Sequence, residues 1–317
     1  MCYPRHRFQI AESHSSTPSL GNGCKLPAFV ASLLGRGIQR TTGDHTMAAI
    51  YIFRTPQLRR PYHFSRPGSI APAIQILMAD PRYKHVVIVA GVGPGLGAAL
   101  VRKLTSEGCG VGMFARSPEF IGKLATEIGR NALAIPADVS NPKRVAATFY
   151  KVRQQLGPIE ILIANASGSV GEGLMETSPG QFERSWRIGV YGAFLCVREA
   201  VLDMRELRSG AIIFTGATSS VRGRGGAVAF SSAKFAVRGL AQSLAVELWP
   251  KGIHVAHVII DGVIDTAGVR KRPKASAKEP LLNPEAIAEA CWNLIQQDRS
   301  AWSLEIDLRP NKEAFFE

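Results

Sequence analysis

A glycine-rich turn between a β-branched run and an apolar helical stretch constrains this chain more than any other feature. Residues 91–97 read GVGPGLG and directly follow the run VVIVA at residues 86–90. Glycines at such a place allow a tight turn, close backbone approach to a pyrophosphate and tight packing of helix on sheet. The free N–H groups at the helix N-terminus favour an anion. The predicted dinucleotide-binding residues of this turn are Gly91, Gly95, Leu96 and Gly97; the alternative is a structural turn without a ligand.

From residue 85 onward, short β-branched runs alternate with longer amphipathic stretches, which is typical of a parallel sheet wrapped by crossover helices. The predicted strands are residues 85–90, 110–115, 132–136, 159–164, 211–215, 254–260 and 304–308. The predicted helices are residues 96–107, 118–128, 142–156, 179–207, 229–249 and 284–296. The sequence therefore predicts an α/β, doubly wound Rossmann fold in residues 78–317, with a single seven-stranded parallel sheet and helices on both faces.

Residues 1–77 differ from the rest of the chain. They are rich in Arg, His, Ser and Pro and show no sustained period of two or 3.6. We interpret them as a disordered or non-native extension outside the fold. An acid-poor transit peptide to an organelle is one alternative, a genuine disordered tail another. We favour upstream sequence included by too early a start, because Met78 lies only a few residues before the first strand.

Charge and composition limit the classes of partner. The net charge is +13, but residues 1–77 hold nine Lys and Arg against two acids, so +7 lies there and +6 remains for the fold. No Arg-rich stripe interleaved with aromatics occurs, and we expect no nucleic-acid partner. The longest apolar stretch, residues 86–101, is broken by four glycines and a proline, so we expect no membrane span.

The five cysteines include no C-x-x-C pair. An odd number without this spacing argues against a disulfide framework and against a zinc site, so we expect no metal. A reducing, cytoplasmic compartment is the corresponding expectation, with organelle targeting by residues 1–77 as the alternative.

The end of the second predicted strand bears on the choice of cofactor. NAD sites commonly place an acid about 20 residues after the glycine turn, on the ribose hydroxyls. Here the strand ends in Arg116 and Ser117 with no acid. A guanidinium and a hydroxyl suit the 2′-phosphate of NADP through charge-assisted hydrogen bonds. We therefore expect NADP, with NAD less favoured; an ordinary exposed loop arginine is the alternative.

Polar side chains also follow the third and fourth predicted strands. Asp138 and Val139 come after the third, and Asn165 and Ala166 after the fourth. Ligands of such sheets bind beyond the carboxyl ends of the strands. We expect these residues to contact adenine and the nicotinamide ribose. Turn chemistry alone is the alternative, because Asp and Asn are common in turns.

Together these motifs resemble the short-chain dehydrogenase/reductase family over nearly all of residues 84–310. The resemblance also rests on the run FSSAK at residues 230–234 and on Asp261-Gly262-x-x-x-Thr266. It implies a seven-stranded Rossmann sheet that binds NAD(P)(H), with Gly262 and Thr266 on the cofactor. It further implies a homodimer or homotetramer assembled through the helices at 179–207 and 229–249.

The sequence departs from the family's catalytic pattern at three of four positions. Phe230 fills the slot of the proton-donating Tyr, Ala217 that of the Ser, and Gly189 that of the helix Asn. Lys234 is retained and is expected to hold the nicotinamide-ribose hydroxyls. Losing a positioned general acid typically costs about 10²–10⁴ in rate. The expected catalytic residues and substitute donors are Lys234, Phe230, Thr218 and Ser219, with Tyr191 and Ser231 as weaker substitutes.

Two further departures adjoin this region. Asp261 stands where the family commonly has Pro, so a carboxylate could approach the nicotinamide carboxamide. The loop at residues 270–280 is basic and takes the place of the family's substrate lid; it suggests either an anionic substrate or a solvated loop.

The predicted function is an NADP(H)-dependent short-chain oxidoreductase with a degenerate catalytic set. It would transfer hydride to or from a small carbonyl, alcohol or activated double bond. The alternative is an inactive NADP(H)-binding pseudoenzyme that acts as a sensor or scaffold. The residues do not name the substrate.

Overall fold

The computed structural model describes residues 82–168, 171–271 and 280–312. The predicted extension at residues 1–77 lies outside the described residues, as does most of the basic loop at 270–280. None of the described helices is both long enough and apolar enough to cross a membrane.

The central sheet has seven parallel strands, and its order is β3-β2-β1-β4-β5-β6-β9. The predicted sheet is confirmed, with strand ends within two residues of those expected. The order reverses between β1 and β4, the position at which such sheets bind ligands. The strands are β1 Val86–Ala90, β2 Gly110–Ala115, β3 Ala132–Pro136, β4 Ile161–Ala164, β5 Gly210–Thr215, β6 Ile253–Ile260 and β9 Glu305–Leu308.

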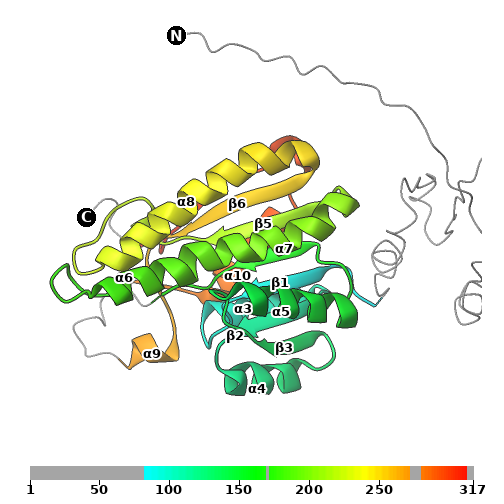
Figure 1. Cartoon of the computed structure of the whole chain (residues 1–317), viewed down its shortest axis with the longest axis horizontal. Helices are drawn as coiled ribbons and strands as arrows, with labels where there is room; N and C mark the ends of the chain where they lie inside the picture. Colours follow the sequence, from blue (N-terminus) through cyan, green and yellow to red (C-terminus); the bar gives the residue numbers. More distant parts are fainter. Residues whose placement is uncertain (1–81, 169–170, 272–279, 313–317) are drawn as a thin grey trace, which may run out of the picture. The chain divides into compact units, whose positions relative to one another are not determined.

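Helices cover both faces of this sheet (Figure 1). The first face packs on α5 Pro142–Gln155, α7 Gly192–Leu207 and α8 Val228–Leu248, and the second on α3 Leu96–Ser106, α4 Pro118–Ile128 and α10 Pro284–Ile295. Both faces of the central strands are therefore buried, and β1 and β6 read as continuous apolar or buried runs.

The predicted helix at residues 179–207 is not one α-helix. It consists of α6 Pro179–Trp186, a π-helical segment η1 Arg187–Tyr191, and α7. Ser178 starts α6 with a capping box shared with Gln181. Single π-turns inside helices are frequent at functional sites, and this one contains Gly189.

Several short elements were not predicted. After β6 the chain forms a two-stranded pair, β7 Val263–Ile264 with β8 Leu281–Leu282, and the short helix α9 Ala267–Arg270. Three 3₁₀ turns connect larger elements: η2 Thr218–Ser220, η3 Trp249–Lys251 and η5 Arg299–Ala301. Such elements are too short to produce a period in the sequence.

Candidate active site

The glycine turn packs against the end of β4. Gly91 has a φ of +104°, and a Cβ added there would lie 2.4 Å from the backbone nitrogen of Ala166. A Cβ on Gly97 would lie 2.8 Å from the carbonyl oxygen of Gly91. Glycine is therefore required at both positions, by conformation at the first and by close packing at the second. The backbone N–H groups of Gly91 and Val92 both donate to the carbonyl of Phe114 at the end of β2.

Asn165 connects this turn to the neighbouring strand end. Its side-chain amide donates to the carbonyl oxygen of Gly91 at 2.7 Å. Its side-chain oxygen accepts from the hydroxyl of Thr215, the last residue of β5, at 3.0 Å. Asn165 thus spans the carboxyl ends of β1, β4 and β5, where the fold places a ligand.

The structure also brings Thr266 to the glycine turn. A Cβ added to Gly95 would lie 2.7 Å from Cγ2 of Thr266. The hydroxyl of Thr266 caps α9 by accepting from the backbone N–H of Val269 at 3.2 Å. Gly262 is the second residue after the end of β6, on the same edge of the sheet. The two residues implied by the resemblance therefore lie on the edge that holds the turn.

Arg116 and Ser117 lie exposed just after β2. Ser117 is the N-cap residue of α4, but its side chain makes no capping hydrogen bond. Both side chains are therefore available at the outer end of the glycine turn.

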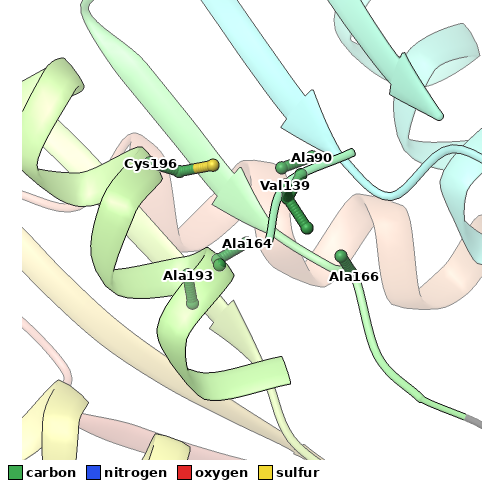
Figure 2. A pocket seen from close by; sticks show the side chains of 7 residues that line it. Ala90, Val139, Ala164, Ala166, Ala193 and Cys196 are labelled. Atoms are coloured by element: carbon green, nitrogen blue, oxygen red, sulfur yellow. The ribbon is translucent and has the colours of Figure 1, made fainter. Parts of the chain in front are cut away.

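Asp138 and Val139 follow β3 with different surroundings. One oxygen of the Asp138 carboxylate accepts from the backbone N–H and hydroxyl of Ser140, at 2.9 and 2.7 Å. This is the turn geometry anticipated as the alternative. Val139 is buried and borders a small apolar hollow that is partly open to solvent. Figure 2 shows the small side chains around it: Ala90, Val139, Ala164, Ala166, Ala193 and Cys196.

Lys234 is a buried cation on α8, 7% exposed. Its ammonium group donates to the carbonyl oxygen of Thr215 at 2.8 Å and lies 5.6 Å from the ring centre of Phe230. Among the described residues no carboxylate forms a salt bridge with it. Burial lowers the pKa of Lys234 to about 8.

The three departing positions lie on segments that contact Lys234 or its neighbours. Phe230 is one helical turn before it, and Ala217 is two residues beyond Thr215. Gly189 lies in the π-helical segment, where an added Cβ would be 3.8 Å from Cβ of Ala233. Phe230 and Ala217, at the predicted Tyr and Ser positions, carry no hydroxyl, and they lie one turn before Lys234 and two residues after its partner Thr215.

The nearby hydroxyl groups differ in accessibility. Ser219 is 1% exposed and accepts a hydrogen bond from the hydroxyl of Ser231 at 3.2 Å. Ser231 in turn accepts from the backbone N–H of Arg224. Thr218 is partly exposed. Of the two hydroxyls predicted as substitutes, only that of Thr218 lies open at the surface of the site.

Asp261 is held by two arginines. The carboxylate is fully buried, and one of its oxygens accepts from Arg222 at 2.7 Å and pairs with Arg309. This joins the segments that follow β5, β6 and β9. The other oxygen, Oδ1, is buried and has no hydrogen-bond partner among the described residues, so the expected approach of this carboxylate to the carboxamide stays a prediction.

A second buried network was not predicted. His257 on β6 is fully buried, and its Nδ1 lies 3.0 Å from Glu305, which also binds Arg238 through two hydrogen bonds. A Cβ added to Gly216 would lie 2.4 Å from Nε2 of His257. The His257 ring therefore packs against the backbone of the residue that follows Thr215. Burial is the main cause that lowers the pKa of His257. The sequence signal for this network is the presence of histidines within the otherwise apolar run of β6.

The fold and this edge define a nucleotide-binding α/β protein with a buried lysine at its site, and comparison with known proteins gives its family. A model of the short chain dehydrogenases matches residues 85–277. The chain is 30% identical over 224 residues to cis-4-hydroxycyclohexanecarboxylate dehydrogenase of Sinomonas cyclohexanicum, covering 67% of this chain and 90% of that protein. It is 33% identical over 187 residues to versicolorin reductase 1 of Aspergillus parasiticus, covering 57% of this chain and 70% of that protein.

A solved structure agrees. The short-chain dehydrogenase from Rhodopseudomonas palustris is 36% identical, with a TM-score of 0.61, covering 71% of this chain and 98% of that one. The chain therefore belongs to the short-chain dehydrogenase family, and its relatives include dehydrogenases and reductases.

In the described part of the chain, no group of His, Cys, Asp or Glu could hold a metal ion. The arrangement offers a cradle for a diphosphate, a buried ammonium group and a partly exposed hydroxyl. These groups can bind a dinucleotide and place one cation beside a reacting oxygen.

Proposed function

We propose that this protein is an NADP(H)-dependent oxidoreductase that transfers hydride to or from a small carbonyl, alcohol or activated double bond, with a reduced set of catalytic groups. The observation that carries the proposal is the link from the glycine turn through Asn165 and Thr215 to Lys234. A cofactor-binding turn and a retained lysine held by one hydrogen-bonded chain favour catalysis at this edge. The family membership and the relatives named as dehydrogenases and reductases support the same reaction class.

A nicotinamide dinucleotide supplies the hydride or accepts it. In our proposal the turn at Gly91, Gly95, Leu96 and Gly97 holds the pyrophosphate, with Thr266 and Gly262 on its far side. Glycine lets this turn pack closely against Ala166 and Thr266, and the free N–H groups at the N-terminus of α3 favour such an anionic group. Asn165 and Ala166 adjoin the nicotinamide ribose, and Lys234 donates to the ribose hydroxyls. Val139 and the hollow beside it adjoin the adenosine half.

We propose NADP rather than NAD because Arg116 and Ser117 are exposed at the end of β2, without a hydrogen-bonded cap. A phosphate on the adenosine ribose would gain charge-assisted hydrogen bonds there. Asp138 remains a proposed adenine contact, although one of its oxygens is used in the turn with Ser140.

We propose a homodimer or homotetramer assembled through α7 and α8. These helices carry the exposed apolar side chains Phe194, Leu202, Phe235 and Val246. Large apolar groups on two long neighbouring helices favour burial against a second copy. Size-exclusion chromatography with light scattering tests the assembly, and Leu202→Asp with Val246→Asp should shift it to the monomer.

The proposed compartment is the cytoplasm. Cys109, Cys196 and Cys291 are free thiols and are buried. Free thiols fit a reducing environment.

The decisive experiment is a panel of ketones, aldehydes and enones incubated with NADPH, with the loss of nicotinamide absorbance as readout. Fluorescence titration with NADPH runs in parallel. Turnover of any member supports the proposal. Tight NADPH binding without turnover across the panel would instead identify a cofactor-binding pseudoenzyme, and absence of binding would reject both functions.

A further inference from the structure

The family's reaction needs a proton donor beside the reacting oxygen, and the described residues leave few groups for this task. Phe230 has no acidic proton, and Ala217 has no hydroxyl. Ser219 is buried and already accepts from Ser231. Ser231 is also buried and bonded to Ser219. Three groups remain: the partly exposed Thr218, the half-buried Tyr191 on η1, and the ammonium group of Lys234.

Lys234 lies beside Phe230 and is bound to Thr215, two residues before Ala217. Its Nζ is 2.8 Å from the carbonyl of Thr215 at the end of β5 and 5.6 Å from the centre of the Phe230 ring. Only one hydrogen-bond acceptor from the described residues reaches this ammonium group. An ammonium carries three donors. Two N–H bonds therefore remain for a ligand in a buried place where both hydroxyl groups are missing.

We propose that the ammonium group of Lys234 itself donates the proton to the reacting oxygen, in the role that a tyrosine hydroxyl would otherwise fill. This rests on the proposed oxidoreductase function and deepens it. In the reducing direction, a bound nicotinamide would supply a hydride with its electron pair to the substrate carbon and be oxidised, and the π pair of the substrate C=O bond would move to its oxygen. One N–H bond of Lys234 breaks, its electrons stay on Nζ, and the proton joins the substrate oxygen. The neutral amine regains a proton from solvent.

The surroundings of Lys234 support this role. Burial lowers its pKa to about 8, so at neutral pH it is a charged donor that gives up its proton more readily than an exposed lysine. The charged or titratable groups packed near it are His257 on β6, Arg238 one turn along α8, and Glu305 on β9, which pairs with both. Glu305 is engaged by those two groups, so it does not compensate the charge of Lys234.

The sign of the pH dependence follows. Reduction requires the ammonium form, so the rate should fall as pH rises through the pKa of Lys234. Oxidation requires the neutral amine, so the rate in that direction should rise over the same interval. A hydroxyl donor such as Thr218 would give no such transition near this pH.

The test compares the wild type with Lys234→Arg, which keeps a positive charge but does not release a proton at these pH values. The matched control is Lys251→Arg, which changes an exposed lysine in η3, the short turn that follows α8. Measurements are NADPH binding by fluorescence, the pH–rate profile for the best substrate of the panel, and titration of the lysine side chains by NMR. The Lys234 signal is assigned by its loss in the variant.

We expect Lys234→Arg to bind NADPH, with reduced affinity, because its guanidinium still donates to the ribose hydroxyls, but to lose about 10²–10⁴ in turnover. Lys251→Arg should keep both properties. The NMR midpoint for Lys234 should coincide with the fall of the reductive rate. The inference is overturned if Lys234→Arg retains turnover, if Lys234 titrates near its ordinary value of 10.5, or if Thr218→Val alone removes the activity and its pH transition. No turnover by the wild type, with or without NADPH binding, would overturn the proposed function as well.

Discussion

The side-chain amide of Asn165 donates a hydrogen bond of 2.7 Å to the carbonyl oxygen of Gly91, although the two residues lie 74 positions apart. Through Thr215 the same asparagine is linked to the carbonyl that holds Lys234. The cofactor turn and the retained lysine are thus parts of one polar chain across three strand ends.

Removing the hydroxyl of Thr215 should interrupt this series of hydrogen bonds. The change Thr215→Val keeps the side-chain shape but removes the hydroxyl that donates to Asn165, leaving the Asn165 oxygen without that donor. We expect the free energy of unfolding to fall by about 1–3 kcal/mol and NADPH affinity to weaken. Urea unfolding and fluorescence titration measure the two effects. Thr215→Ser keeps a hydroxyl and is the control; equal behaviour of the Val variant and the wild type would contradict the linkage.

Gly91 and Gly93 form a matched pair within one turn. Gly91→Ala would force a side chain onto a φ of +104° and against Ala166, whereas a Cβ on Gly93 meets nothing within 4 Å. We expect Gly91→Ala to lose at least about 1–2 kcal/mol of stability and its NADPH binding. Gly93→Ala should retain the stability of the wild type. Similar unfolding curves for the two variants would show that the turn relaxes freely.

Arg116 determines the preference between the two cofactors in our proposal. Removing it in Arg116→Ala should cost about 1.5–3 kcal/mol of NADPH binding, roughly a 10- to 100-fold loss, and leave NADH binding unchanged. The control is Lys123→Ala, which removes an exposed cation on α4, seven residues after Arg116 in the sequence. Parallel titrations with both nucleotides measure the effect. An equal loss for NADH and NADPH would remove the assigned role.

Restoring a single tyrosine should not restore ordinary ketone reduction. In Phe230→Tyr the hydroxyl returns, but Ala217 still leaves the carbonyl unpolarised and Gly189 supplies no side chain. We expect weak ketone reductase activity in this variant and a larger gain when Ala217→Ser is added. Initial rates with NADPH and a simple ketone decide this. Strong ketone reduction by the single variant Phe230→Tyr would show that the tyrosine hydroxyl is the one group that limits this activity.

His254 makes stability depend on pH. Burial lowers its pKa from the ordinary 6.5, so the folded state favours the neutral ring. Its contribution is present above pH 6.5 and is lost as pH falls from there toward the folded pKa. We expect the free energy of unfolding to decrease between pH 7.5 and 5.5, as measured by urea unfolding.

In His254→Phe this decrease should become smaller. The new ring can keep the stacking on Trp302, whose centroid lies 4.8 Å away, while the hydrogen bond to the carbonyl of Ser303 is lost. The variant should therefore be less stable by about 1 kcal/mol at pH 7.5. An unchanged pH dependence would mean that other groups are responsible.

The strands and most helices could be predicted because their signals are local. The β-branched runs and the glycine spacing around residue 91 lie within short windows, and the structure confirms the seven-stranded sheet they imply. The helix predicted at residues 179–207 has the expected ends, but the π-helical segment at Arg187–Tyr191 within it was not predicted, because five residues are too few to show a period of their own.

The amino-acid sequence by itself determined the fold class, and it predicted the cofactor turn and the absence of the tyrosine and serine, because each depends on residue type at a fixed spacing. Only the tertiary structure decided that Thr215 joins Asn165 to Lys234, that Ser219 is buried, and that Asp261 binds Arg222 and Arg309. These contacts arise where strand ends that are distant in the chain become neighbours in the sheet. Strand order and side-chain direction set them, and neither leaves a periodic signal in the sequence.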